Sequence, residues 1–337
     1  MAYSKELLIE VSLLHYKNKL RQESIAKKLN ISKSQVTRIL KRANEVGIVQ
    51  INIVDPNKNY EELEIKLAGK FNLKKAIVIE NLGLSDKELD DNLGHAASNY
   101  LQDIIKDGDI IGVSWGTNIN EVINNLPDIF DRNLEVIQLT GGIKGTNYQD
   151  SARQLASKFG IQPHSLFAPA MISSKITRDL LVREKSIREI FEFFKKLNIA
   201  LVSIGSTHHK TTSTLVKSLH VSEDELKYLV NKGAVGDVCM HFFDINGVII
   251  DNNIGGKVIA IPAKDLIEVP YSIGIAGGTR MAEAIYGALK GKFINVLITD
   301  YVTAQKVFDL ENNISITGNS EKESGELHYK GGQLVIS

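Results

Sequence analysis

Apolar residues in the first 55 positions recur three and four residues apart, which is the period of one helix face. This pattern predicts an amphipathic helix over residues 4–18 and a short second helix over Gln22–Leu29. A third helix is expected to begin after Ser32, a good N-cap, and to end at Gly47, a good C-cap. The alternating run over residues 48–54 predicts a strand beside the third helix. The N-terminal region is therefore expected to be a winged helix-turn-helix.

The face of the third helix that avoids the apolar stripe carries amide, hydroxyl and cationic side chains. Amides and hydroxyls read base edges in the major groove, and cations hold phosphates. The N-terminal positions of such a helix meet the bases, so we expect Lys41 and Arg42 to hold the backbone instead. The predicted base-reading residues are Lys33, Ser34, Gln35 and Arg38. The predicted DNA-binding set is Gln22, Lys33, Ser34, Gln35, Thr37, Arg38, Lys41 and Arg42.

Beyond Asp55-Pro56-Asn57 a linking helix is expected over Tyr60–Phe71, and short apolar strands then alternate with amphipathic helices. Such alternation implies a mainly parallel sheet with helices on both faces, a Rossmann-like three-layer α/β/α fold. A hairpin with Asn246-Gly247 at its middle is expected over residues 238–251. The expected strands are 76–80, 109–114, 134–139, 198–205, 271–276 and 295–299. The expected helices include 86–106, 150–159, 183–197, 279–289 and 300–310.

Three of the expected strands run into glycine-containing loops, at residues 115–118, 140–142 and 277–280. Sheets of this class bind ligands beyond the carboxyl ends of their strands. Glycines let backbone N–H groups approach a ligand, and the start of a following helix favours an anionic group such as phosphate. Each loop alone could serve backbone geometry, whereas three loops at one edge of a sheet favour a ligand pocket.

Charge distinguishes the two regions. The 337 residues carry a formal net charge of +0, with 43% hydrophobic and 24% charged residues, as in an ordinary globular chain of two domains. Between Lys17 and Arg42, however, nine basic residues stand against one acid, Glu23. This local excess indicates either a polyanion partner or a solvated basic helix face. A three-helix protein-interaction domain is the alternative for this region.

Several classes of function are disfavoured by what the chain lacks. The single cysteine, Cys239, excludes an internal disulfide and a multi-cysteine metal site. No apolar stretch approaches the roughly 18 residues of a spanning helix, and the N-terminus lacks a signal-peptide layout, so we expect a cytoplasmic protein without membrane contact. Neither GxGxxG nor GxxxxGK[ST] occurs and the histidines form no metal constellation, so no cofactor and no metal are expected.

Six separated motifs, taken together and in this order, resemble the SorC family of bacterial sugar-responsive transcriptional regulators from Ser4 to about Leu310. The resemblance implies an N-terminal winged helix-turn-helix and an effector domain similar to the sugar-phosphate isomerase and glucosamine-phosphate deaminase fold. The motifs are QESIAKKLNISKSQVTRILKRANEVGIVQI (22–51), GVSWGTNI (112–119), QLTGG (138–142), NIALVSIGS (198–206), AVGDVCMHFFDINGVII (234–250) and IGIAGGTRMAEAIYGALKGKFINVLITDYVTA (273–304).

The resemblance also implies an organisation and partners. We expect a DNA-binding domain over 1–55, a linker helix over 56–75, an effector-binding domain over 76–310 and a flexible tail over 311–337. The partners implied are a double-stranded DNA operator and a sugar, polyol or phosphosugar effector that alters operator affinity. A homodimer or homotetramer is implied as the assembly.

Carried over by position, the family's effector cleft maps to the ends of several strands. Asp237 suits the polyol part of a ligand, because a carboxylate accepts hydroxyl hydrogen bonds, and Thr117 and Asn118 suit a phosphate or an oxygen-rich end group. The implied set is Ser114, Trp115, Gly116, Thr117, Asn118, Gly141, Gly142, Asp237, Gly277, Gly278, Thr279 and Arg280.

This chain departs from the family pattern at the cations of the cleft. Thr117-Asn118 stand where the family usually has an Arg-Thr pair, Met281 replaces a common cation, and Met240-His241 stand where small and basic residues are usual. Fewer cations weaken the case for a phosphorylated effector and leave a free sugar or sugar alcohol open.

A second hypothesis is a sugar-phosphate isomerase or deaminase-like enzyme with an appended DNA-binding domain. Such chemistry needs a general base and acid placed about C1 and C2 of the sugar. The carboxylates near the expected loops are Asp237, Glu283 and Asp300, and none is presented with a partner histidine. We therefore predict no catalytic residues and no enzyme activity. A third hypothesis is a constitutive DNA-binding scaffold with an empty pocket.

Overall fold

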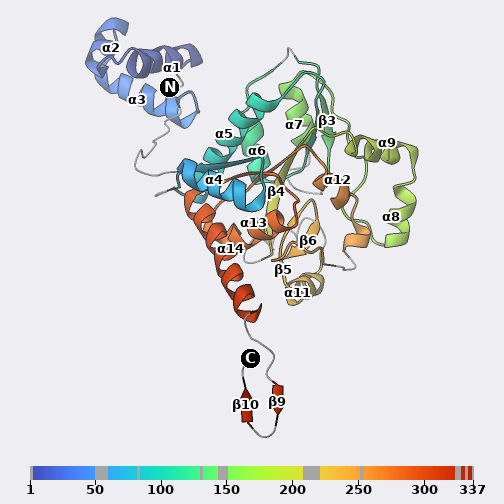
Figure 1. The fold of residues 1–337 in the computed structure, drawn as a ribbon. Coiled ribbons are helices and arrows are strands. Elements are labelled where there is room, and N and C mark those ends of the chain that lie inside the picture. The colour runs from blue at the N-terminus through green and yellow to red at the C-terminus, as the bar shows by residue number, and fades with distance from the viewer. Residues whose placement is uncertain are drawn as a thin grey trace. The chain divides into compact units, whose positions relative to one another are not determined.

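The computed structural model describes residues 3–49, 60–81, 84–129, 132–142, 151–207, 221–250, 254–322, 328–330 and 333–335, with side chains as far as residue 312. The chain divides into two compact units, Met1–Lys58 and Asn59–Ser337, whose elements are labelled in Figure 1. The two units are described separately below.

The smaller unit contains the three expected helices, α1 (Lys5–Ser12), α2 (Gln22–Leu29) and α3 (Lys33–Glu45). α1 continues into a π-helical turn over Leu13–Lys17, where a regular helix was expected. The geometry changes at Ser12, whose buried hydroxyl donates to the Leu8 carbonyl at 2.7 Å, a back-bond that bends helices. The core joins all three helices through Val11, Ile25, Val36, Ile39 and Ala43. Residues 50–54 of the predicted wing lie outside the described residues.

The larger unit is built on a parallel sheet in the order β1-β8-β7-β4-β2-β3, and β5 and β6 extend it in antiparallel fashion from β4. These strands confirm the expected α/β fold. They are β1 Lys75–Ile79, β2 Ile110–Val113, β3 Glu135–Gln138, β4 Ile199–Ser206, β5 Ala234–Val238, β6 His241–Asp244, β7 Tyr271–Ile275 and β8 Val296–Asp300. The helices are α4 Tyr60–Phe71, α5 Asp86–Ile104, α6 Thr117–Asn125, α7 Ser151–Lys158, α8 Lys175–Leu181, α9 Lys185–Phe194, α11 Glu223–Asn231, α12 Ala263–Ile267, α13 Ala282–Lys290 and α14 Tyr301–Lys322.

Side chains alternate along the strands between two hydrophobic clusters, one on each face of the sheet. In β4, Ile199 and Leu201 belong to the cluster that contains α5, α6 and α7. Ala200 and Val202 belong to the other cluster, with α4, α9, α13 and α14. Because both faces of the strands are buried, the strands are apolar without a polar side, and the domain has three layers (Figure 1).

α4 has the expected bounds but is part of the larger unit rather than a free linker. Leu63 and Leu67 are buried in the same cluster as Ile285 of α13 and Val307 of α14. The α4 side chains therefore pack as core residues, which its amphipathic pattern alone did not reveal.

The expected turn at Asn246-Gly247 is present within 238–251, and a hairpin that was not expected precedes it. The strands are β5 and β6, and the tight turn between them is Cys239-Met240, with φ of 49° and 68°. Left-handed backbone at two non-glycine residues is unfavourable, so no turn signal marks this position in the sequence. At Asn246-Gly247 the chain turns again: the Asp244 N–H donates to the Val248 carbonyl at 3.0 Å and the Ile250 N–H to the Phe242 carbonyl at 2.9 Å, on either side of a bridge between Phe243 and Ile249.

Helix bounds differ from expectation mainly in the C-terminal half of the chain. The helix expected over 183–197 is the shorter α9, and a helix that was not expected, α8, precedes it. α14 runs to Lys322, twelve residues beyond the predicted end at Leu310. Within the region expected as a tail, β9 (His328–Lys330) and β10 (Gln333–Val335) pair with each other in antiparallel fashion.

The order of the strands creates a place for a ligand. β2 and β4 are neighbours in the sheet. From β2 the chain continues through α6 to β3, on the side of β2 away from β4, whereas the next parallel strand after β4 is β7, on the side of β4 away from β2. The sheet therefore changes direction between β2 and β4, and ligands of such sheets bind outside the carboxyl ends of the strands at this point.

Candidate DNA-binding face and effector cleft

α3 turns one face to the core and the opposite face to solvent. It begins with a capping box, in which the Gln35 N–H donates to Ser32 Oγ at 3.1 Å and the Ser32 N–H donates to the Gln35 amide oxygen at 2.8 Å. Val36, Ile39 and Ala43 are fully buried, so the polar positions between them point outward. The predicted DNA-binding residues of α3 are all exposed or partly exposed.

The polar residues at the start of α3 are bonded within the unit. Lys33 Nζ pairs with Glu23 Oε1 at 2.7 Å and lowers the pKa of that carboxyl by its hydrogen bond. The Thr37 hydroxyl donates to the Gln22 amide oxygen at 2.8 Å. These contacts fasten α2 to α3, and the Gln35 amide is engaged in the capping box. Because the pairs are exposed, DNA can replace them at little cost in free energy.

The cations farther along α3 are less engaged. Arg38 donates through Nε to the Ser34 carbonyl at 3.3 Å, and Arg42 pairs with Glu45 at 3.1 Å, one turn away. Lys41 is exposed and forms no ion pair with a described carboxylate. Arg38 and Lys41 are therefore the candidates with the most capacity for new contacts.

The loop after β2 is tied to β4 and β7. Ser203 in β4 donates its N–H to the Ser114 hydroxyl at 3.2 Å. The side-chain amide of Asn118, in the first turn of α6, donates to the Ile275 carbonyl at the end of β7 at 3.1 Å. Gly116 is the N-cap of α6, which begins at Thr117. Residues 114–118 therefore bring three strand ends together at the point where the sheet changes direction.

Three of the four buried side-chain polar atoms that have no hydrogen-bond partner among the described residues lie in the segments that follow β2 and β3. They are Trp115 Nε1, Asn118 Oδ1 and Thr140 Oγ1. Buried polar groups are normally satisfied, and atoms left over beside a cleft are suited to a ligand with hydroxyl groups. Thr140 was not among the predicted site residues, because only burial and the missing partner distinguish it from other loop threonines.

Gly141 and Gly142 use their N–H groups inside the protein. Gly141 donates to the Ile259 carbonyl at 2.9 Å and Gly142 to the Ala168 carbonyl at 2.8 Å. A Cβ on Gly141 would lie 2.5 Å from the Pro169 carbonyl carbon, so this glycine permits a close backbone approach. The expectation that these two N–H groups are available to a ligand is wrong, and their loop holds neighbouring segments together.

Asp237 is buried and nearly without partners. Its Oδ2 accepts from the Met240 N–H at 3.1 Å, the one hydrogen bond it forms among the described residues. Burial raises the pKa of this carboxyl from 3.8 to about 6, and the Met240 bond opposes the shift. Asp237 pairs with Gly205 across β4 and β5, and a Cβ on Gly205 would lie 2.2 Å from Asp237 Oδ1. Gly205 is thus a positioning residue that the sequence reasoning missed.

The loop after β7 is held by the buried carboxylate of Asp300. Its Oδ2 accepts from the Gly278 N–H at 2.6 Å and from the Thr303 hydroxyl at 2.5 Å. Its Oδ1 accepts from the Thr303 N–H at 3.1 Å and from the Asn81 side-chain amide. The four donors occupy the acceptor positions of this carboxylate, so Asp300 positions the loop of Gly277 and Gly278.

The cations beside this loop are already engaged. Arg280 is half-exposed and pairs with Asp86 of α5 at 3.0 Å. Asp90, one turn along α5, lies nearby, and burial together with Asp86 raises its pKa to about 6. Lys306 of α14 donates to the Thr279 carbonyl at 3.3 Å. The structure therefore directs Arg280 toward α5, while Ser114 and Asn118 contact β4 and β7 and Asp237 lies opposite Gly205 near the end of β4.

The described histidines and the cysteine do not form a catalytic or metal site. His164 Nε2 lies 2.8 Å from Glu135 Oε2 at the start of β3, at the opposite end of the parallel strands from their carboxyl ends. The His241 ring contacts the Ile261 carbonyl at 2.8 Å, and burial lowers its pKa. Cys239 is buried, which raises the pKa of its thiol. Among the described residues no group of three histidine, cysteine or acidic side chains could hold a metal ion.

A helix-turn-helix unit with an exposed basic helix, followed by a parallel α/β unit with unpaired buried polar groups beside its switch point, is the arrangement expected of a ligand-sensing DNA-binding protein. Comparison with known families supports this class: residues 55–309 match the Sugar-bind family model, described as "Putative sugar-binding domain". The chain belongs to this family, within the SorC group of sugar-binding transcriptional regulators.

Curated relatives align over nearly the whole chain. The deoxyribonucleoside regulator of Bacillus subtilis (strain 168) is 34% identical over 305 residues, 89% of this chain and 96% of the relative. The sorbitol operon regulator of Klebsiella pneumoniae is 31% identical over 308 residues, 89% of this chain and 96% of the relative. The crystal structure of full-length SorC from Klebsiella pneumoniae superposes with a TM-score of 0.72 at 30% identity, over 91% of this chain and 99% of that chain.

These findings establish the class of function. The protein is a transcriptional regulator with DNA and a sugar-type effector as its ligands, and the enzyme hypothesis is not supported. Among the described residues, no helix combines the length and apolar character needed to cross a membrane.

Proposed function

We propose that this protein controls a carbohydrate-utilisation operon by binding its operator through α3, with an affinity set by an effector held at the ends of β2, β4 and β7. Two observations carry the proposal, one in each unit. The smaller unit exposes a basic helix face, and the larger unit buries a carboxylate, Asp237, whose single hydrogen bond leaves acceptor capacity for a ligand.

The cleft chemistry favours a ligand rich in hydroxyl groups. Asp237 and Asn118 Oδ1 accept from hydroxyls, Trp115 Nε1 donates to them, and Thr140 can do either. The effector class is a sugar, a sugar alcohol or a sugar phosphate. Arg280 is paired with Asp86, and Asp90 lies nearby. These two acids reduce the binding free energy that a phosphate would gain beside the loop after β7, so they favour an uncharged effector.

The DNA contacts divide along α3. Lys33, Ser34 and Arg38 are proposed to read base edges, and Lys41 and Arg42 to hold phosphates. Gln22 and Thr37 hold α2 against α3 and reach the backbone beside it. Gln35 caps α3 and reaches a base only if its bond to the Ser32 N–H is exchanged.

The proposed assembly follows from the spacing of DNA half-sites, and the proposed effector response follows from unequal binding to two arrangements of the protein. One helix-turn-helix makes few base contacts, so we propose a homodimer or homotetramer in the cytoplasm, whose paired modules read half-sites about one helical turn apart or a multiple of it. The effector must bind the DNA-competent and DNA-incompetent arrangements unequally, because equal affinity would shift neither population.

Two measurements test the proposal. A duplex from the region upstream of the protein's own operon should bind in a salt-sensitive manner, and Arg38→Ala should weaken that binding. A thermal-shift screen of sugars, polyols and their phosphates should raise the unfolding temperature of the wild type but not of Asp237→Asn. If no nearby promoter binds, or if no compound in the screen changes either DNA affinity or melting, the proposal is wrong. A response confined to phosphorylated compounds would contradict the preference for an uncharged effector.

A further inference from the structure

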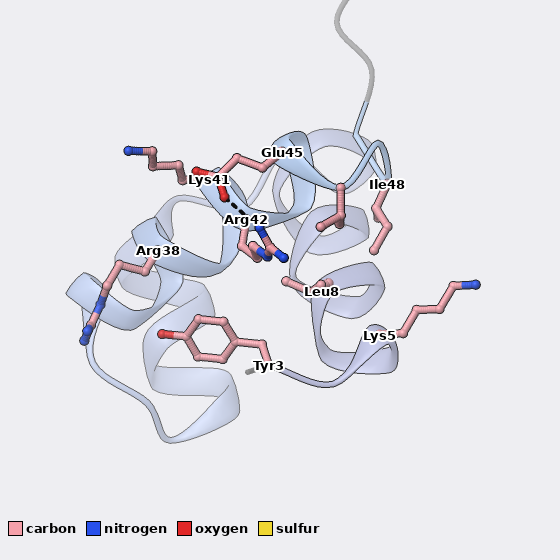
Figure 2. Close-up of a pocket in the computed structure, with 9 residues that line it drawn as sticks. Tyr3, Lys5, Leu8, Arg38, Lys41, Arg42, Glu45 and Ile48 are labelled. Carbon is pink, nitrogen blue, oxygen red and sulfur yellow. Dashed lines mark hydrogen bonds and ion pairs between the residues drawn. The ribbon is translucent and has the colours of Figure 1, made fainter. Parts of the chain in front are cut away.

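A groove crosses the smaller unit between the start of α1 and the second half of α3 (Figure 2). Its apolar part consists of the buried Leu8, together with Val46 and Ile48. Its polar and charged lining comes from Tyr3, Lys5, Arg38, Lys41, Arg42 and Glu45. Two lining residues, Tyr3 and Lys5, precede the helix-turn-helix and were not among the predicted DNA-binding residues.

The groove carries an excess of positive charge. Four cations line it against one acid, Glu45, and that acid is already paired with Arg42 at 3.1 Å. Neither Lys5 nor Lys41 forms an ion pair with a carboxylate of residues 3–49. The occupant that this charge favours is therefore an anion, and an extended one, because the cations come from two helices.

The position of the groove identifies the anion. α1 packs against α3 through Leu8 and Val11 on one side and Ile39 and Ala43 on the other. Lys5 lines the α1 side of the groove, with its side chain pointing outward (Figure 2). A helix about 10–12 Å in diameter fills a major groove about 12 Å wide, so surfaces flanking that helix meet the sugar-phosphate backbone. Apolar walls with cations suit the deoxyribose and phosphate groups of such a backbone.

We infer that this groove holds the phosphodiester backbone of one DNA strand, with Lys5 and Tyr3 as phosphate contacts additional to those of α3. The inference rests on the proposed function, because it presumes that α3 lies in the major groove. The Lys5 ammonium contacts a phosphate oxygen, and the Tyr3 hydroxyl donates to the same strand. These contacts carry no sequence information, since the backbone is alike at every base pair.

Salt dependence of DNA binding tests the inference without knowledge of the operator sequence. Each phosphate contact adds about 0.9 to the slope of log affinity against log salt concentration. Lys5→Gln, measured on the full-length protein, should reduce that slope by about one and weaken binding by the same factor for an upstream duplex and for an unrelated duplex of equal length. Lys5→Arg should restore the slope, and Tyr3→Phe should weaken binding to both duplexes equally but less.

The matched control is Lys185→Gln, which removes the same charge from an exposed lysine of α9 in the larger unit and should leave the slope unchanged. Both lysines are exposed, so far-ultraviolet circular dichroism and the melting temperature should match those of the wild type.

The possible results separate this inference from the proposed function. An unchanged slope for Lys5→Gln, with normal binding by the wild type, would overturn the inference and leave the regulator intact. A loss confined to the upstream duplex would also overturn it, because it would indicate base contact. Absence of salt-sensitive binding by the wild type would instead remove the proposed function.

Discussion

Asp300 and Asp237 are both buried near the carboxyl ends of the strands in the larger unit, but their surroundings differ. Asp300 accepts four hydrogen bonds, from Gly278, Thr303 and Asn81. Asp237 accepts one hydrogen bond among the described residues, from the Met240 N–H, and burial raises its pKa to about 6. The two carboxylates are both buried, but they differ in the number of hydrogen bonds that they accept.

This difference separates a carboxylate that builds the fold from one that is available to a ligand. A buried charge with four donors is compensated, and removing it leaves those donors unpaired. A buried charge with one donor is costly, and the protein retains it only where it serves another purpose. The four predictions below test this contrast, from the largest expected effect to the smallest.

Replacing Asp300 should be the most damaging change. Asp300→Ala leaves the Gly278 N–H, the Asn81 amide and the Thr303 donors without their acceptor, so the free energy of unfolding should fall by about 4 kcal/mol. Chemical denaturation measures this loss. Asp309→Ala, which removes an exposed carboxyl from α14, the helix that follows Asp300, is the control and should change stability little. A similar small loss for Asp300→Ala would show that its network is not structural.

Replacing Asp237 should have the opposite effect on stability. A folded-state pKa of about 6 against 3.8 means that the folded protein binds more protons between these values, so its stability falls as pH rises from 3.8 to 6 and then stays constant. Asp237→Asn removes this cost and should raise the free energy of unfolding at pH 7 by about 3 kcal/mol. It should also abolish the effector response of DNA binding.

Thermal melts at several pH values provide the measurement for Asp237→Asn, and Asp224→Asn is the control because its side chain is 95% exposed. A destabilised Asp237→Asn variant would mean that the wild-type carboxylate is compensated by contacts of its own, like Asp300.

Gly205→Ala tests whether Asp237 is placed by the strand opposite it. The added Cβ would lie 2.2 Å from Asp237 Oδ1, so the carboxylate must move. We expect a loss of about 2 kcal/mol in stability from this overpacking and a roughly tenfold loss of effector affinity in titration calorimetry. Gly69→Ala in α4, where a Cβ meets open space, should stabilise the protein by about 0.5–1 kcal/mol. An unchanged effector affinity in Gly205→Ala would separate Asp237 from the binding site.

The pH dependence of effector binding should show the smallest effect. An effector whose hydroxyls donate to Asp237 prefers the ionised carboxylate, which at pH 5 is roughly a tenth of the population when the pKa is about 6. Affinity should therefore be about tenfold weaker at pH 5 than at pH 7.5, with the change centred near pH 6. Titration calorimetry at both pH values measures it, and an affinity independent of pH would exclude Asp237 as a direct acceptor.

Local sequence patterns were sufficient to predict those elements whose structure depends on residues close together in the chain. The three helices of the smaller unit, the basic face of α3 and the alternation of strands and helices follow from periodicity and caps within a few residues. The Cys239-Met240 turn was missed for the same reason, because nothing local favours left-handed backbone at those residues. Its stabilising contact, from the Met240 N–H to Asp237, exists only in the folded hairpin.

The sequence by itself determined the basic recognition helix, the parallel α/β architecture and the glycine-containing loops at the strand ends. Only the tertiary structure decided which of these loops use their N–H groups for hydrogen bonds within the protein. Gly141 and Gly142 donate their N–H groups to segments more than 25 residues away, and Gly278 donates to Asp300. Whether a polar group has a hydrogen-bond partner depends on residues that folding brings together. Glycine pairs that look alike in the sequence therefore serve different purposes. Asp237 differs from Asp300 in the number of donors that the folded chain places around it.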